Sequence, residues 1–175
     1  MSRFNVDDVI CHVHTRKEGL LSRIAHDLCF SVDGLDVQLD GKSGEAEIDP
    51  MRIRLLGAKR NDVVDPKVLS AGDRKRVLAN LRTDVLNVAK FPQISYRWRL
   101  ELLTPTTVTL QGSLSLHGVE RPLVFRGAVD GDIARLTARF DQRDFGIVPF
   151  RAAFGALKVH PELRIELTVP LTALD

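Results

Sequence analysis

The chain has 175 residues, 44% of them hydrophobic, and at this length one domain buries a substantial core without disulfide or metal cross-links. Its 25 basic and 23 acidic side chains are spread along the sequence and leave a formal net charge of +2. Because no basic block is present, the sequence excludes the electrostatic pattern typical of nucleic-acid-binding proteins.

The N-terminal residues do not form a basic segment followed by an apolar one, and no apolar run in the sequence approaches eighteen residues. We therefore expect a soluble, cytoplasmic protein. The cysteines, Cys11 and Cys29, have no metal-binding spacing and fall in different strand phases, so free thiols are favoured over a disulfide.

The first third of the chain predicts short strands. Residues 4–15 alternate loosely, and residues 28–32 and 35–39 alternate clearly, with Asp33-Gly34 between them. A turn over 40–44 then leads into a further extended segment that reaches Leu55.

The middle of the chain predicts a helical insertion at about 66–90. Ser70 followed by Asp73 resembles a helix cap, and apolar residues recur at helical spacing from Val77 to Val88. Phe91-Pro92 ends it. Its basic face, residues 74–82, is expected to be solvated, and transient contact with an anionic membrane surface is the alternative.

The second half of the chain predicts strands at 96–102, 106–117, 123–130, 134–140 and 165–171. A four-residue connection at 118–121 would place Gly112 opposite Gly127 in a hairpin. Two facing glycines predict either a sharp corner of a barrel or a cavity wall.

About eight strands with mostly tight connections and one helical insertion indicate an all-β, antiparallel, up-and-down β-barrel formed as a single domain over 1–175. Closure of the sheet would remove exposed edges. The interior of such a barrel is either filled by side chains or holds one slender ligand.

Three segments resemble successive signatures of the YceI-like lipid/polyisoprenoid-binding family: VLNVAKFPQISY at 85–96, LQGSLSLHGVERPL at 110–123 and RDFGI at 143–147. Residues 18–22 and 25–28 resemble the family's early segment, so the resemblance spans nearly the whole chain. It implies a lipocalin-like barrel whose interior holds an isoprenoid lipid or quinone, with a helix beside it. The family's usual periplasmic location is in doubt here because no secretion signal is seen.

We therefore predict non-catalytic binding or transport of a slender apolar ligand, with no cofactor and no metal. The predicted ligand-binding residues are apolar or glycine positions facing the barrel interior, plus one arginine at its mouth for an anionic head group: Phe30, Val32, Tyr96, Trp98, Leu100, Leu110, Gly112, Leu114, Leu116, Phe125, Gly127, Phe140 and Arg143. The same side chains could instead fill a solid core, and Arg143 could instead brace a turn with Asp144.

Two other functions stay open. An enzyme acting on a hydrophobic substrate would use His26, Asp27, Arg143 and Asp144, although the sequence carries no recognisable catalytic motif. A packed, ligand-free barrel could serve as a stress-response or interaction module, as a homodimer formed through an edge strand.

The histidines give a weak metal signal. His12 and His14 share one strand face, with His26 and Asp27 further along, but the spacing matches no zinc motif. Polar neighbours on a wet strand face are the favoured interpretation.

Overall fold

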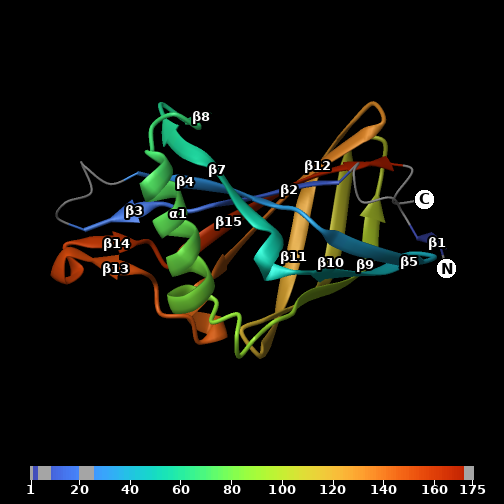
Figure 1. Cartoon of the computed structure of the whole chain (residues 1–175). Coiled ribbons are helices and arrows are strands. Elements are labelled where there is room, and N and C mark those ends of the chain that lie inside the picture. The colour runs from blue at the N-terminus through green and yellow to red at the C-terminus, as the bar shows by residue number, and fades with distance from the viewer. Residues whose placement is uncertain (1, 4–8, 20–25, 172–175) are drawn as a thin grey trace.

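A computed structural model describes residues 2–3, 9–19 and 26–171 of the chain, and within them one long antiparallel sheet dominates (Figure 1). It contains twelve described strands in the spatial order β1 (Ser2–Arg3), β5 (Leu35–Asp40), β6 (Ser43–Ile48), β9 (Ile94–Leu103), β10 (Thr107–Leu116), β11 (Val119–Asp130), β12 (Ile133–Asp141), β15 (Glu162–Pro170), β2 (Ile10–His14), β4 (Leu28–Val32), β7 (Ile53–Arg60) and β8 (Val63–Asp65). A second, small sheet has the order β13 (Arg151–Ala152), β14 (Leu157–Val159) and β3 (Lys17–Glu18).

The predicted helix is present as α1 (Ala71–Asn80), which continues into the π-helical turn η3 (Leu81–Val85). Ser70 caps it as expected, since its hydroxyl accepts a hydrogen bond from the amide of Asp73. Three short 3-10 segments complete the described elements: η2 (Pro50–Arg52), η4 (Gln142–Phe145) and η5 (Ala153–Gly155). Among the described helices, none combines the length and the apolar character that crossing a membrane requires.

The antiparallel, mainly β fold with one helix is confirmed, but the predicted closed, up-and-down barrel of about eight strands is wrong. The described sheet has two ends, β1 and β8, and curls into a half-barrel whose end strands do not pair. The pairs β5–β6 and β7–β8 and the run from β9 to β12 are neighbours both in sequence and in space. Elsewhere distant parts of the chain are neighbours, since β15 pairs with β12 and with β2. The helix α1 contacts β7, the strand next to the end strand β8. Figure 1 shows this helix toward one end of the molecule and β9 to β12 toward the other.

The β10–β11 hairpin has a tighter turn than predicted. His117 and Gly118 both have positive φ, at 54° and 75°, and form a two-residue turn that pairs Leu116 with Val119. Gly112 therefore pairs with Leu123 and Gly127 with Val108, so the two glycines do not face each other.

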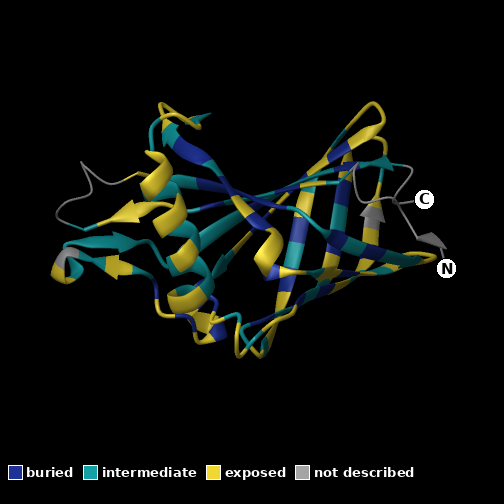
Figure 2. Ribbon diagram, viewed as in Figure 1, coloured by how far each residue is buried: buried dark blue, intermediate teal, exposed yellow. Residues whose placement is uncertain are grey.

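Buried residues alternate along β9 to β12 (Figure 2), and we call this end of the half-barrel the packed end. The ring of Tyr96 stacks on Trp98 at 5.6 Å between centroids and meets Phe125 edge-on at 5.3 Å, and its hydroxyl donates to the carbonyl of Leu123 at 3.0 Å. The packed end comprises Tyr96, Trp98, Leu100, Val108, Leu110, Leu123, Phe125, Leu136 and Val169.

The glycines of this hairpin are required by close packing and leave no hole. A Cβ added at Gly112 would collide with the carbonyl oxygen of Arg97 and lie 2.8 Å from the Tyr96 ring. A Cβ at Gly127 would collide with the carbonyl oxygen of Arg135. The glycines thus let a ring and a neighbouring strand approach the backbone closely. Of the two alternatives that the sequence left open, a barrel corner and a cavity wall, this close packing disfavours the cavity wall.

Candidate functional site

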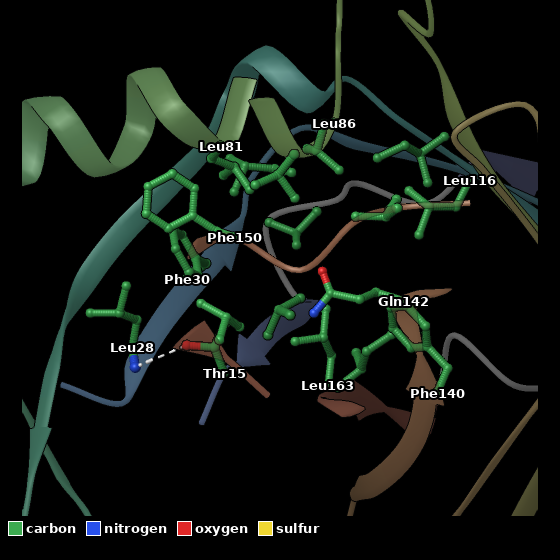
Figure 3. A pocket seen from close by; sticks show the side chains of 18 of the residues that line it. Thr15, Leu28, Phe30, Leu81, Leu86, Leu116, Phe140, Gln142, Phe150 and Leu163 are labelled. Atoms are coloured by element: carbon green, nitrogen blue, oxygen red, sulfur yellow. Dashed lines mark hydrogen bonds between the residues drawn. The ribbon is translucent and has the colours of Figure 1, made fainter. Parts of the chain in front are cut away.

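An apolar cavity of about 300 Å³ lies between the inner face of the sheet and the helix, at the end opposite the packed end (Figure 3). We call this region the hollow end. None of the described residues that line it is charged. The sheets contribute Cys11, Val13, Leu28, Phe30, Val32, Ile48, Ile53, Ile94, Leu114, Leu116, Phe140, Val159, Leu163 and Ile165; α1, η3 and the next residue contribute Val77, Asn80, Leu81, Val85 and Leu86; and Thr15, Gln142, Ile147 and Phe150 complete the wall.

Cross-strand register explains why the cavity is confined to one end. Along β10, Val108 and Leu110 belong to the packed end, whereas Leu114 and Leu116 line the cavity. Because β15 runs antiparallel to β12, the start of β15 lies beside the end of β12, and Leu163 pairs with Phe140 at the cavity. Alternation thus supplies inward apolar side chains at both ends, and the helix covers them at the hollow end only.

Two arginines fasten the helix over the cavity. The guanidinium of Arg74 donates to the carbonyl oxygens of Leu55 at 2.5 Å and Pro66 at 3.2 Å. Arg82 donates to the carbonyl oxygen of Met51 at 3.0 Å. The basic face expected to be solvated is therefore used in part for attachment to β7 and its flanking segments, because each guanidinium can satisfy backbone acceptors there.

The polar groups of the wall are few and neutral. Thr15 accepts a hydrogen bond from the amide of Leu28 at 3.2 Å, and the side-chain amide of Gln142 donates to the carbonyl of His160 at 3.1 Å. Burial raises the pKa of the Cys11 thiol to about 12, so it stays protonated at neutral pH. The wall therefore offers dispersion contacts and a few neutral hydrogen-bonding groups, and no ionised group.

Five predicted ligand-binding residues line the cavity: Phe30, Val32, Leu114, Leu116 and Phe140. Seven others lie in or beside the packed end and are not among the lining residues: Tyr96, Trp98, Leu100, Leu110, Gly112, Phe125 and Gly127. Their placement differs from the prediction because the stacked aromatic rings fill their own end of the half-barrel.

The sequence analysis predicted the helix and an extended segment over 4–15 but did not assign α1, η3 or β2 to the cavity wall. The signals were present: the apolar face of the helix needs a partner to bury it, and residues 9–15 alternate, although loosely. Neither signal says which strands the helix covers.

Arg143, predicted at the mouth, lies on η4 and is exposed. Its guanidinium pairs with Asp141, at 2.9 Å from Nε to Oδ1, and not with Asp144 as predicted for a braced turn. This hydrogen bond is the main reason that the pKa of Asp141 is lowered. The geometry indicates a braced turn, and Arg143 does not line the cavity.

The residues of the enzyme alternative are also outside the cavity. His26 is exposed, and the carboxylate of Asp27 accepts a hydrogen bond from the amide of Lys17 at 2.7 Å. Neither of them, nor Asp144, lines the cavity. An apolar substrate held there would meet none of the groups proposed to act on it.

Comparison with known proteins gives the same fold. Residues 21–171 match the sequence model of the YceI-like domain. The chain is similar to a polyisoprenoid binding domain from Saccharophagus degradans, with 9% identity, a TM-score of 0.62 and coverage of 95% of this chain and 94% of that one. It is also similar to BcnA of Burkholderia cenocepacia, with 10% identity, a TM-score of 0.59 and coverage of 94% and 96%. No curated protein matches the chain. At these identities the structural likeness shows the fold alone.

Proposed function

The chain belongs to the YceI-like domain family, and from this premise we propose that its cavity binds a slender, uncharged apolar chain of isoprenoid type and that the protein catalyses no reaction. The composition of the cavity wall carries this proposal. It is built almost entirely from leucine, isoleucine, valine and phenylalanine, with no charged side chain among the described lining residues. Such a wall recognises hydrocarbon by exclusion of water, at about 0.8 kcal/mol per buried methylene.

The size of the cavity limits how much of a ligand it holds. At about 300 Å³ it lies at the lower end of the range for ligand pockets, roughly 300–1,000 Å³. We therefore expect a short isoprenoid, or one end of a longer chain, with any charged head group outside the cavity, because an unpaired charge in an apolar site is costly.

The fold supports the isoprenoid class. The Saccharophagus degradans protein with the same fold is described as a polyisoprenoid binding domain. A prenylated quinone is compatible with the wall as well, since its ring oxygens are neutral acceptors and Thr15, Asn80 and Gln142 are polar side chains of the wall.

The proposal is tested by extracting freshly purified protein with organic solvent and analysing the extract by mass spectrometry. A near-stoichiometric isoprenoid is expected. Added short-chain isoprenols and quinones should also raise the melting temperature of delipidated protein, by an amount equivalent to about 2.7 kcal/mol at a ligand concentration 100 times Kd. Empty extracts together with no thermal shift from any isoprenoid would refute the proposal and favour a ligand-free packed module.

A matched pair of helix variants locates the binding. Val77 lines the cavity, whereas Ala79, two residues along the same helix, is exposed. Val77→Trp should weaken isoprenoid binding at least about tenfold, because an indole that displaces two methylenes of ligand already removes that much free energy. Ala79→Trp should leave the affinity unchanged; equal losses in both variants would place the ligand elsewhere.

A further inference from the structure

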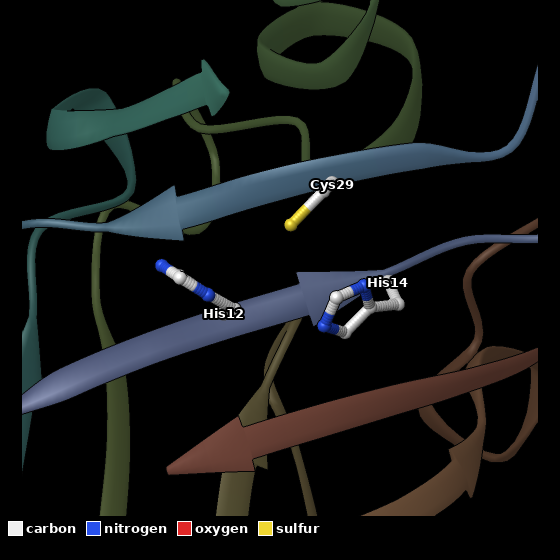
Figure 4. Close-up of side chains that lie close together, drawn as sticks. All are labelled: His12, His14 and Cys29. Atoms are coloured by element: carbon white, nitrogen blue, oxygen red, sulfur yellow. The ribbon is translucent and has the colours of Figure 1, made fainter. Parts of the chain in front are cut away.

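The face of β2 opposite the cavity carries a cluster of metal-binding side chains that the proposed function does not use (Figure 4). Cys11 and Val13 point into the cavity, so alternation along β2 places His12 and His14 on the other face. The β2–β4 register sets His14 opposite Cys29, and the β2–β15 register sets His12 opposite Glu166. Three strands thus bring two imidazoles, a thiol and a carboxylate together.

The donor atoms are close enough to share one ion. One ligand atom each from His12, His14 and Cys29 lie within 4.8 Å of one another. Zinc binds imidazole nitrogen at about 2.0–2.1 Å and thiolate sulfur at about 2.3 Å, which requires tetrahedral donors to be roughly 3.3–3.6 Å apart. Small rotations of the side chains, above all of the less buried His12, would close the difference. Figure 4 shows the Cys29 sulfur directed from β4 toward β2, between the two histidines.

The hydrogen bonding of His14 leaves one ring nitrogen available to bind a metal ion. Its Nε2 lies 2.8 Å from a carboxylate oxygen of Glu166, and because the carboxylate accepts, Nε2 carries the proton. Its Nδ1 is left with a lone pair, is buried, and has no hydrogen-bond partner among the described residues. The His14 residue as a whole is only 8% exposed, and Cys29 is fully buried. Buried acceptors are rarely left unpaired, and a carboxylate that orients a histidine in this way is common in zinc sites.

We propose that the chain binds a divalent transition metal ion of the zinc type through Sγ of Cys29, Nδ1 of His14 and an imidazole nitrogen of His12, with Glu166 positioning His14 and the fourth coordination position left open. As the sulfur–metal bond forms, the thiol proton passes to solvent, while His14 contributes its lone pair and keeps the proton held by Glu166. Two nitrogens and one sulfur favour zinc-like ions over calcium or magnesium, which prefer oxygen.

The local charge is compatible with a dication. Lys59 and Arg164 lie near enough to act on the cluster electrostatically and oppose a cation there. Arg164 is paired with Glu166 at 2.5 Å. A thiolate at Cys29 and the carboxylate of Glu166 supply two negative charges against them.

A cobalt titration of tag-free, chelator-treated protein tests the site. Co²⁺ should give the absorption of tetrahedral cobalt together with a thiolate-to-cobalt charge-transfer band, and Zn²⁺ should displace it. Cys29→Ser should abolish the charge-transfer band, whereas Cys11→Ser, on the opposite face of the sheet, should keep it. Absence of the band from the unmodified chain, or its survival in Cys29→Ser, would overturn the proposal.

Histidine and glutamate variants separate binding from positioning. His12→Gln and His14→Gln should each weaken cobalt binding by more than about 100-fold. Glu166→Gln should weaken it by about 10–100-fold and retain the charge-transfer band at saturating cobalt, because the thiolate ligand is still present. If Cys29→Ser does not fold, as judged by circular dichroism, His12→Gln decides, since His12 is less buried; an unchanged affinity in that variant would overturn the proposal.

Discussion

The packed end and the hollow end of the half-barrel are built on the same alternating strands, yet one is solid and the other encloses a cavity. At the packed end Tyr96, Trp98 and Phe125 stack across the interior, and glycine at 112 gives the Tyr96 ring room against the backbone. At the hollow end the inward side chains are mostly aliphatic, and a helix held by two arginines covers them. The cavity therefore lies where no stacked aromatic rings fill the interior and a helix covers the inner face of the sheet. It does not lie where the strands contain glycine.

The largest expected difference between the two ends concerns phenylalanines. Phe125 is 3% exposed in the packed end, whereas Phe150 is half-buried beside the cavity. Phe125→Ala should lower the free energy of unfolding by about 3–5 kcal/mol. Phe150→Ala should cost less than about 2 kcal/mol, because its ring is only partly removed from water. Urea denaturation measures both, and equal losses would remove the distinction between the ends.

The attachment of the helix gives the next largest effect. Arg74→Met removes charged hydrogen bonds to the backbone and should lower the free energy of unfolding by about 1.5–3 kcal/mol, while speeding the release of a bound isoprenoid. Arg76→Met is the matched control, since Arg76 is exposed and pairs only with Asp73 among the described residues; it should change stability little. Unfolding curves measure the stability and stopped-flow experiments measure ligand release. If the two variants behave alike in both, Arg74 does not hold the helix over the cavity.

Two glycine substitutions test how closely the packed end is packed. Gly112→Ala should destabilise the protein by about 1–3 kcal/mol, because both the Tyr96 ring and the backbone at Arg97 must move away from the added methyl group. It should leave isoprenoid affinity unchanged in the folded fraction, since Gly112 does not line the cavity. Gly72→Ala, in the first turn of α1, where an added Cβ would meet only the Ser70 hydroxyl oxygen at 3.9 Å, should be neutral or stabilising by up to about 1 kcal/mol. A large loss of isoprenoid affinity in Gly112→Ala would indicate that the ligand binds beside the β10–β11 hairpin.

The smallest expected effect is that of Arg143. Its hydrogen bond lowers the pKa of Asp141, so the pair contributes stability at neutral pH that is lost as the pH falls through the pKa of the folded state. Arg143→Gln should raise the pKa of Asp141 toward its ordinary value, as followed by carboxyl NMR. The change in stability should be small, because the guanidinium is exposed. A marked loss of isoprenoid affinity would show that Arg143 serves the ligand after all.

Local patterns predicted the antiparallel strands and the capped helix, because alternation, helical spacing and capping are properties of neighbouring residues. Short sequence segments likewise sufficed for the resemblance to the family. Register depends on the exact length of each turn, which alternation does not reveal: the positive φ of His117 and Gly118 shortens the hairpin turn and moves Gly112 away from Gly127. Closure depends on contacts between strands that are distant in sequence. Likewise, nothing near Cys29 in the sequence indicates that β4 will place it beside His12 and His14, so the metal-binding cluster follows from the sheet order alone.

Methyl NMR of leucine- and valine-labelled protein, titrated with a short isoprenoid, shows directly which end of the half-barrel binds the ligand. We expect shifts at hollow-end methyl groups such as Val13, Val77, Leu81 and Leu114, and almost none at Val108, Leu110, Leu123 and Val169 of the packed end. Shifts centred on the packed end, or none at saturating ligand, would contradict this expectation.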